Sequence, residues 1–225
     1  MSRIVVTGAS DGIGKSLAIE LAKEGHNIVL FGRDKERLLT VAAQANDAEF
    51  HAFDLNDYEA MNKAITSVLG AGEIDILINN AGIWHKVGDL ETISDELILE
   101  VINTNFTSQI LLTKKLLPHI RNRDGSFIVN IVSKSGITSQ EGQSVYSASK
   151  WGLRGFTDVL RADTKADKVH VIGVYQSGTN TKLFEKAGED FLVESFTSPD
   201  DLAKVIAFTL KQPPTLRVNE IRIDK

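Results

Sequence analysis

Cysteine is absent from this chain of 225 residues. The protein can therefore form no disulfide and can use no thiolate as a nucleophile or metal ligand. Its five histidines show no spacing typical of a metal site, so we expect no bound metal. A chain without cysteine agrees with a reducing compartment, and we expect a cytoplasmic protein.

Long apolar runs and an excess of positive charge are missing as well. No apolar run reaches the ~18 residues that a membrane span needs. The N-terminus enters the apolar pattern Ile4-Val5-Val6 at once, without the apolar segment of a secretory signal. The net charge is −5. These absences argue against a membrane protein, an exported protein and an extended nucleic-acid-binding surface.

The sequence does contain a regular alternation of short β-rich runs and longer segments of helical period. Strands are expected at Arg3–Val6, Asn27–Phe31, Glu49–Phe53, Ile74–Ile78, Ser126–Val132, Val169–Val174 and Glu220–Ile223. Helices are expected near Ile13–Glu24, Lys35–Gln44, Tyr58–Leu69, Asp95–Ile120, Val145–Lys165 and Pro199–Lys211. Several strands are apolar without alternation, as in a parallel sheet buried on both faces. We therefore predict one α/β domain over residues 1–225, a Rossmann-type doubly wound sheet of about seven strands in the order 3-2-1-4-5-6-7.

Glycines gather where the first predicted strand ends, in the run Thr7-Gly8-Ala9-Ser10-Asp11-Gly12-Ile13-Gly14. Glycines allow a tight turn and let a phosphate reach the amides at the positive end of the following helix. The run is a candidate phosphate cradle, although such a turn can also be an ordinary loop. It also approximates the P-loop of a nucleoside triphosphatase, with Gly14-Lys15-Ser16. However, the fourth strand leads into Asn79-Asn80-Ala81-Gly82, which offers amides where such an enzyme needs a carboxylate.

Tyr146 and Lys150 stand at a helical spacing in the run Tyr146-Ser147-Ala148-Ser149-Lys150. On a helix they share one face, close enough for the ammonium to stabilise the phenolate and lower the pKa of the tyrosine. A tyrosine of this kind can act as a proton donor near neutral pH. Taken alone, the pair can equally be a solvated surface pair.

The glycine run, Asn79-Asn80-Ala81-Gly82 and Tyr146-x-x-x-Lys150 occur in this order over nearly the whole chain. Together they resemble the motifs of the short-chain dehydrogenase/reductase family. The resemblance implies an oxidoreductase that interconverts a ketone or aldehyde and an alcohol by hydride transfer with a nicotinamide cofactor, Tyr146 being the general acid/base. A non-catalytic dinucleotide-binding regulator would share the fold, and the P-loop enzyme is a remote alternative.

The resemblance also implies four catalytic residues, namely Asn105, Ser133, Tyr146 and Lys150. Ser133 ends the fifth predicted strand and would hydrogen-bond the substrate oxygen. Neighbouring Ser135 is its competitor. Lys150 would hold the nicotinamide ribose, and Asn105 would anchor a water in a proton relay behind it. Asn103 is the alternative match, and a mid-helix asparagine can also lie at the surface or bond its local backbone.

Cofactor contacts follow from the same resemblance. The pyrophosphate would lie on the glycine run, which contributes Gly8, Ser10, Asp11, Gly12, Ile13 and Gly14. Asp54 and Leu55 would contact the adenine, although Asp54 can also cap the helix before Tyr58. Asn80, Ala81 and Gly82 would line the adenosine-side ribose, and Thr179 and Thr181 would contact the carboxamide.

We expect a preference for NADP(H) over NAD(H) from the end of the second strand, Gly32-Arg33-Asp34. Gly32 stands where an acidic residue would bind a ribose 2′-hydroxyl, and Arg33 can clamp a 2′-phosphate with Ser10 as second donor. Arg33 can also be a solvated arginine that opens a helix. The chain departs from its relatives at Asp11, where they often carry a basic residue, and at Gln176-Ser177-Gly178, where they carry Pro-Gly. We expect cofactor binding to survive both changes.

Residues 182–198 are expected to form a lid over a small-molecule carbonyl or alcohol substrate. The lid is rich in phenylalanine, which favours an apolar substrate, although the same side chains can simply pack on the core. The candidate substrate contacts are Trp84, Gln140, Gln143 and Phe184. His85 is expected to face the pocket beside Trp84, although a lone histidine there is more often a loop residue than a ligand. The resemblance implies a homodimer or homotetramer assembled through the helices near Asp95–Ile120 and Val145–Lys165.

Overall fold

A parallel sheet forms the centre of the computed structural model, which describes residues 1–121, 123–213 and 215–225. Within these residues the sheet has seven strands in the order β3-β2-β1-β4-β5-β6-β7. The strands are β1 Arg3–Thr7, β2 Asn27–Gly32, β3 Glu49–Ala52, β4 Ile76–Asn79, β5 Ser126–Ile131, β6 Val169–Gln176 and β7 Glu220–Ile223. The predicted fold class, strand number and strand order are confirmed.

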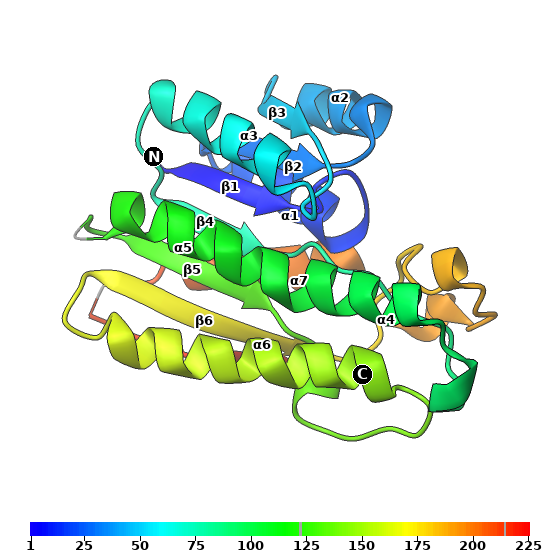
Figure 1. The fold of residues 1–225 in the computed structure, drawn as a ribbon. Coiled ribbons are helices and arrows are strands. Elements are labelled where there is room, and N and C mark those ends of the chain that lie inside the picture. The colour runs from blue at the N-terminus through cyan, green and yellow to red at the C-terminus, as the bar shows by residue number, and fades with distance from the viewer. Residues whose placement is uncertain (122, 214) are drawn as a thin grey trace.

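Helices cover both faces of the sheet, and Figure 1 shows α5 and α6 in front of it with α7 behind. The helices are α1 Gly12–Lys23, α2 Lys35–Gln44, α3 Tyr58–Gly70, α4 Asp95–Ile102, α5 Ser108–Ile120, α6 Ser144–Asp163 and α7 Pro199–Leu210. Side chains alternate along a strand, so Ile4 and Val6 of β1 pack with α1, α2 and α7, whereas Val5 packs with α3 and α5. Burial on both faces explains why the strands read as continuous apolar runs.

Local sequence marks where several helices begin. Asp34 precedes α2 and accepts from the Arg37 amide, and Asp57 precedes α3 and accepts from the amides of Glu59 and Ala60. Ser198 caps α7, with proline at its first turn. The expectation that Asp54 caps the helix at Tyr58 is wrong, because Asp57 holds that position.

The predicted continuous helix Asp95–Ile120 is wrong in the middle, where a π-helix interrupts it. The α-helical turns end at Ile102, and Asn103–Thr107 form a π-helix, η2, before α5 begins. Such segments bond each amide five residues back and often occur at functional sites. This one carries Asn105 into the interior, where its side chain is fully buried. The reading of Asn105 as a surface asparagine is therefore wrong.

All strands point the same way, so their carboxyl ends meet at one edge of the sheet. The loops after β1, β2, β4, β5 and β6 gather at this edge and carry the sequence motifs. Over the described residues, we find no helix with the length and apolar character needed to cross a membrane.

Candidate active site

A cavity of about 350 Å³ lies at the carboxyl edge of the sheet. Cavities of several hundred Å³ suit ligands of cofactor size. Fourteen of the predicted cofactor residues line it, namely Gly8, Ser10, Asp11, Gly12, Ile13, Arg33, Asp54, Leu55, Asn80, Ala81, Gly82, Tyr146, Lys150 and Thr181. The cavity therefore joins the glycine loop to the tyrosine–lysine pair, as a nicotinamide dinucleotide requires.

The glycine loop is held against the turn after β4. Gly8 has a φ of +63° and approaches that turn so closely that an added Cβ would lie 2.9 Å from the Ala81 Cα. Asn80 donates through Nδ2 to the Thr7 carbonyl at 2.8 Å, and the Thr7 hydroxyl accepts from the Asn80 and Ala81 amides at 2.9 and 3.0 Å. Gly14 packs behind the loop, where its missing Cβ leaves room for the Gly8 carbonyl. The loop backbone is thus open to a phosphate, which fits a dinucleotide.

The P-loop alternative gains no support from this arrangement. The Ser16 hydroxyl donates to Asp200 of α7 at 2.6 Å, and Lys15 lines a separate groove beside α7. A P-loop would turn both side chains toward bound phosphate and magnesium.

Ser133 follows β5 with a strained backbone. Its φ of +122° and ψ of +156° lie in a region that side-chain-bearing residues rarely occupy. The amides of Val132 and Ser133 both donate to the Val174 carbonyl, at 2.9 and 3.2 Å, which resembles a β-bulge and turns the Ser133 side chain. Its hydroxyl accepts from the Ser135 amide at 3.1 Å and acts on the Tyr146 phenol in the direction of a lower pKa. Ser135 instead donates to Gln143 at 3.1 Å, so the geometry favours Ser133 over its competitor.

We expect the free energy of unfolding of Ser133→Gly to exceed that of Ser133→Ala by about 1 kcal/mol, because glycine adopts this backbone conformation without strain. Both variants lack the hydroxyl, so its loss does not contribute to the difference. Urea unfolding of the two proteins measures the difference. Ser135 is the matched control, since its φ is not positive. Ser135→Gly should be less stable than Ser135→Ala. If glycine were the less stable replacement at Ser133 as well, the backbone at Ser133 would not be strained.

Tyr146 and Lys150 lie on the first turns of α6, and both are buried. Lys150 Nζ donates to the Ile131 carbonyl at 3.0 Å and lies 5.7 Å from the centre of the Tyr146 ring. Burial raises the pKa of Tyr146 to about 12, and Ser133 acts in the opposite direction. Burial also lowers the pKa of Lys150 to about 8. Burial thus opposes the lowering of the Tyr146 pKa that we expect from Lys150 and the oxidised nicotinamide, and that lowering stays a prediction.

Asn105 ties the turn after β4 to α6. Its Oδ1 accepts from the Ile83 amide at 2.8 Å, and its Nδ2 donates to the Ile83 carbonyl at 2.9 Å and to the Ser149 hydroxyl at 3.2 Å. A Cβ added to Gly82 would lie 3.3 Å from Asn105 Oδ1 and 3.6 Å from Lys150 Nζ. Asn105 therefore stands beside the lysine, and its part in a water relay stays a prediction.

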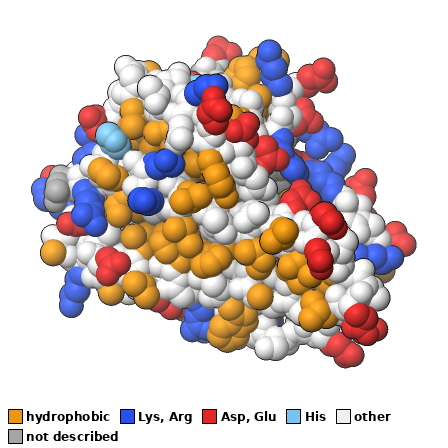
Figure 2. Space-filling view, viewed as in Figure 1, with side chains coloured by type: hydrophobic (Ala, Val, Ile, Leu, Met, Phe, Trp, Pro, Cys, Tyr) orange, Lys and Arg blue, Asp and Glu red, His pale blue; other side chains and the backbone are white. Residues whose placement is uncertain are grey.

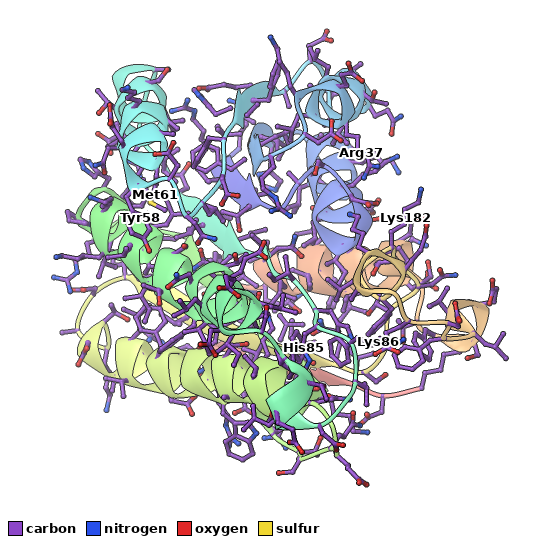
Figure 3. All side chains as sticks on the ribbon, turned by 45° about the vertical axis from the view of Figure 1, so that its right-hand side comes forward. Arg37, Tyr58, Met61, His85, Lys86 and Lys182 are labelled. Atoms are coloured by element: carbon purple, nitrogen blue, oxygen red, sulfur yellow. The ribbon has the colours of Figure 1, made fainter. Side chains whose placement is uncertain are left out.

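At the adenosine end, the structure adds two cations that the sequence analysis missed. Arg37 of α2 bonds with Asp11 at 3.4 Å and with Asp34 at 3.1 Å, and Lys186 of the lid bonds with Asp11 at 2.9 Å. Partial burial favours a neutral Asp11, but Lys186, the Gly12 amide and Arg37 together outweigh it and hold the pKa of Asp11 below its usual value. Figure 3 shows Arg37 and Lys182 on the same side of the molecule. Arg37 lies in the first turn of α2, four residues after Arg33, and this short spacing is the signal that could have revealed it.

Arg33 also lines the cavity, where its Nη1 lies 3.5 Å from Asp54 and 3.7 Å from Glu100. Both ion pairs are exposed to water and weak, so an incoming phosphate can compete for the guanidinium. Three of the cations that line the cavity, Arg33, Arg37 and Lys186, thus lie at this end, and Lys182 lines the cavity as well.

On the opposite side, Tyr146 is covered by aromatic residues. The ring of Trp84 lies 4.4 Å from the Tyr146 ring, and Phe184 of the lid packs edge-on against Trp84 at 5.1 Å. Glu189 of the lid accepts from Trp84 Nε1 at 3.3 Å and from the Val87 amide at 2.5 Å. Trp84 and Phe184, two of the predicted substrate contacts, therefore pack together beside Tyr146. Through Phe184 and Glu189 the lid covers the tyrosine.

Gln140, Gln143 and Thr179 are not among the residues that line the cavity. Gln143 donates to Gln140 at 2.5 Å and accepts from Ser135, so their contact with a substrate stays a prediction. Thr179 is buried and pairs with Thr197 of the lid. Gly178 lies directly against Phe196, where a Cβ would approach the ring at 2.8 Å. Glycine thus shapes the turn in which relatives carry Pro-Gly.

The chain is similar to known dehydrogenases and reductases along most of its length. The family model described as short chain dehydrogenase matches residues 2–191. Dehydrogenase/reductase SDR family member 7B of Xenopus laevis is 37% identical over 194 residues, and the match covers 80% of this chain and 59% of the frog protein.

Two solved structures share the fold. A short-chain dehydrogenase from Sphingobium yanoikuyae in complex with NADPH is 27% identical with a TM-score of 0.87, and the match covers 99% of this chain and 87% of that one. A 3-ketoacyl-(acyl-carrier-protein) reductase from Brucella melitensis complexed with NADH is 27% identical with a TM-score of 0.88, covering 98% and 96%. Similar structures thus hold either dinucleotide.

Proposed function

Because the chain belongs to the short-chain dehydrogenase/reductase family, we propose that it interconverts a ketone or aldehyde and an alcohol, with NADP(H) as preferred cofactor. The chain is an oxidoreductase that uses a dinucleotide and acts on a small molecule. One observation carries the finer proposal: the Tyr146 phenol lies at the wall of a cavity that begins at the glycine loop, with Lys150 Nζ 5.7 Å from its ring and Ser133 acting to lower its pKa.

The side chains account for the proton chemistry of such a reaction. When bound, the nicotinamide supplies or takes up the hydride. In the direction of reduction, Tyr146 gives its proton to the carbonyl oxygen while the Ser133 hydroxyl bonds the same oxygen. The resulting phenolate is stabilised by Ser133 and by the Lys150 ammonium, and in oxidation it takes the proton of the alcohol. Trp84 and Phe184 exclude water from the phenol.

Turnover with a panel of aldehydes, ketones and secondary alcohols, followed by NADPH absorbance, tests the proposal. We expect turnover, and faster turnover for apolar members because of the aromatic residues around Tyr146. A protein that binds NADPH but converts no member of the panel would sink the proposal and favour the non-catalytic regulator.

The three cations at the adenosine end support the preference for NADP(H). We expect Arg33→Leu and Arg37→Leu each to lower kcat/KM for NADPH about 10-fold or more, because each removes a charge-assisted bond to the 2′-phosphate worth about 1.5–3 kcal/mol. The same variants should change kcat/KM for NADH by less than about 3-fold, because NADH has no 2′-phosphate for the arginines to bind. Arg222→Leu, which removes a surface ion pair on β7, is the control. Equal losses with both cofactors, or a wild-type preference for NADH, would contradict the assignment.

A homodimer or homotetramer formed through α5 and α6 belongs to the same proposal. Figure 2 shows hydrophobic side chains in a band over these helices. A groove between the helices is lined by Ile110, Leu117, Phe156 and Leu160, among others, and Val159 of α6 is 60% exposed. We expect light scattering to find an oligomer and Val159→Glu to shift it toward the monomer, because the charge would be buried at the contact. Leu39→Glu on α2 is the control, and a monomeric wild type would refute the assembly.

A further inference from the structure

His85 lies in a loop after β4, yet only 1% of its surface is exposed. Its Nδ1 lies 2.9 Å from the Lys86 carbonyl oxygen, and its Nε2 lies 3.1 Å from the backbone nitrogen of Tyr146. A backbone N–H can only donate a hydrogen bond, so Nε2 must accept and the proton of the neutral ring must be on Nδ1. These two contacts therefore define both the tautomer and the orientation of the imidazole.

The Nε2 contact completes the first turn of α6. The first amides of a helix have no acceptor within it, and the amide of Tyr146 is one of them. Gln143 precedes the helix, and within the described residues its side chain makes no capping bond. His85 supplies the missing acceptor from 61 residues away in the sequence, where the loop after β4 passes the start of α6 (Figure 3).

Trp84 contacts the other end of the same tyrosine. Its ring lies against the phenol ring, and the rings of Trp84 and His85 are nearly parallel, at 15° and 6.2 Å. Consecutive residues of one loop therefore hold both the side chain and the backbone amide of Tyr146. The same loop contains Ile83, which Asn105 ties to α6.

We propose that His85 is a positioning residue for the reaction. By accepting the Tyr146 amide bond it holds the first turn of α6 so that the phenol meets the Ser133 hydroxyl and the substrate oxygen. Helix ends fray when their amides lack acceptors, and a misplacement of about 1 Å at a reacting group can cost on the order of 100-fold in rate. Lys150 lies one turn further along α6 and depends less on this bond. The inference rests on the proposed function, because it takes Tyr146 as the proton donor.

Three variants test the role of His85. In His85→Leu the acceptor is lost, and we expect kcat to fall 10- to 100-fold while the Kd for NADPH changes less than twofold. In His85→Gln the side-chain amide oxygen can take the place of Nε2, and we expect kcat to return to within about threefold of wild type. His170→Leu replaces a buried histidine of β6 that packs on Phe127, and it should leave kcat unchanged.

Hydrogen–deuterium exchange over residues 144–150 gives a readout that does not depend on turnover. Exchange should be faster in His85→Leu than in wild type and normal in His85→Gln. The inference is overturned if His85→Leu keeps the wild-type kcat and exchange, if His85→Gln is as impaired as His85→Leu, or if cofactor binding falls in step with kcat. A wild-type protein that converts no carbonyl or alcohol would instead refute the proposed function, and the exchange data would still report on the contact with Tyr146.

Discussion

Replacement of Tyr146 by phenylalanine is expected to lower kcat by about 1,000-fold or more, because general acid catalysis contributes roughly 100- to 10,000-fold. The change removes the hydroxyl that gives or takes the proton and leaves the ring packed between Trp84 and α6. Binding of NADPH should survive, since the glycine loop and Lys150 are unaltered. Steady-state kinetics and a separate measurement of the NADPH Kd distinguish the two effects.

Tyr175 of β6 offers a matched control for this variant. Burial raises its pKa to about 12, as it does for Tyr146, and its hydroxyl has no hydrogen-bond partner among the described residues. Tyr175→Phe should therefore keep its kcat and lose no stability, since an unpaired buried hydroxyl is removed. If Tyr146→Phe retained a tenth of the activity or more, Tyr146 would not be the proton donor.

Replacement of Lys150 by methionine is expected to have opposite effects on activity and stability. The pKa of Lys150 is lowered from 10.5 to about 8 by burial, so the folded protein holds this charge less well than the unfolded chain does. The shift corresponds to a penalty on the order of 3 kcal/mol that is fully present below pH ~8 and disappears as the pH rises toward ~10.5. Methionine removes the penalty together with the hydrogen bond to Ile131, so the unfolding free energy at pH 7 should rise by about 1–3 kcal/mol. Activity should fall about 100-fold or more, because the phenolate loses its neighbouring cation.

Urea unfolding at pH 7 and near pH 10 measures the stability of this variant. The gain of Lys150→Met over wild type should be largest at pH 7 and should shrink at the higher pH. Lys23→Met, at an exposed lysine of α1, should change the unfolding free energy by less than about 0.5 kcal/mol. A Lys150→Met protein that is less stable than wild type at pH 7, or a gain that does not depend on pH, would contradict the penalty.

The fold could be predicted because its signals are local. Strands buried on both faces are apolar without interruption, and helices between them keep one apolar stripe, so the alternation of β1 through β7 with their helices is visible in the sequence. Cap residues such as Asp34 and Ser198 mark helix starts. The π-helix around Asn105 has no comparable signal, because the Asn105 side chain bonds with Ile83 in the loop after β4, which is far away in the sequence.

The candidate site could be predicted only in part. The glycine loop and Ser133 lie at strand ends, which the parallel sheet brings to one edge, and Tyr146 and Lys150 begin the helix that follows β5, so the sequence predicts that these residues meet. Arg37 and Lys186 were missed because their place beside Asp11 depends on how α2 and the lid fold over the glycine loop. The contact of His85 with the Tyr146 amide was missed because an imidazole cap leaves no pattern around Tyr146 in the sequence.

The sequence by itself therefore determined the order of the strands, the family and the motif residues at the carboxyl edge. These properties follow from periodicity and from short motifs, which residues close together in the chain define. Only the tertiary structure decided the backbone strain at Ser133, the raised pKa of Tyr146 and the aromatic cover over its ring. Each of these depends on burial by segments far away in the sequence, and removal from water is a property of the assembled protein.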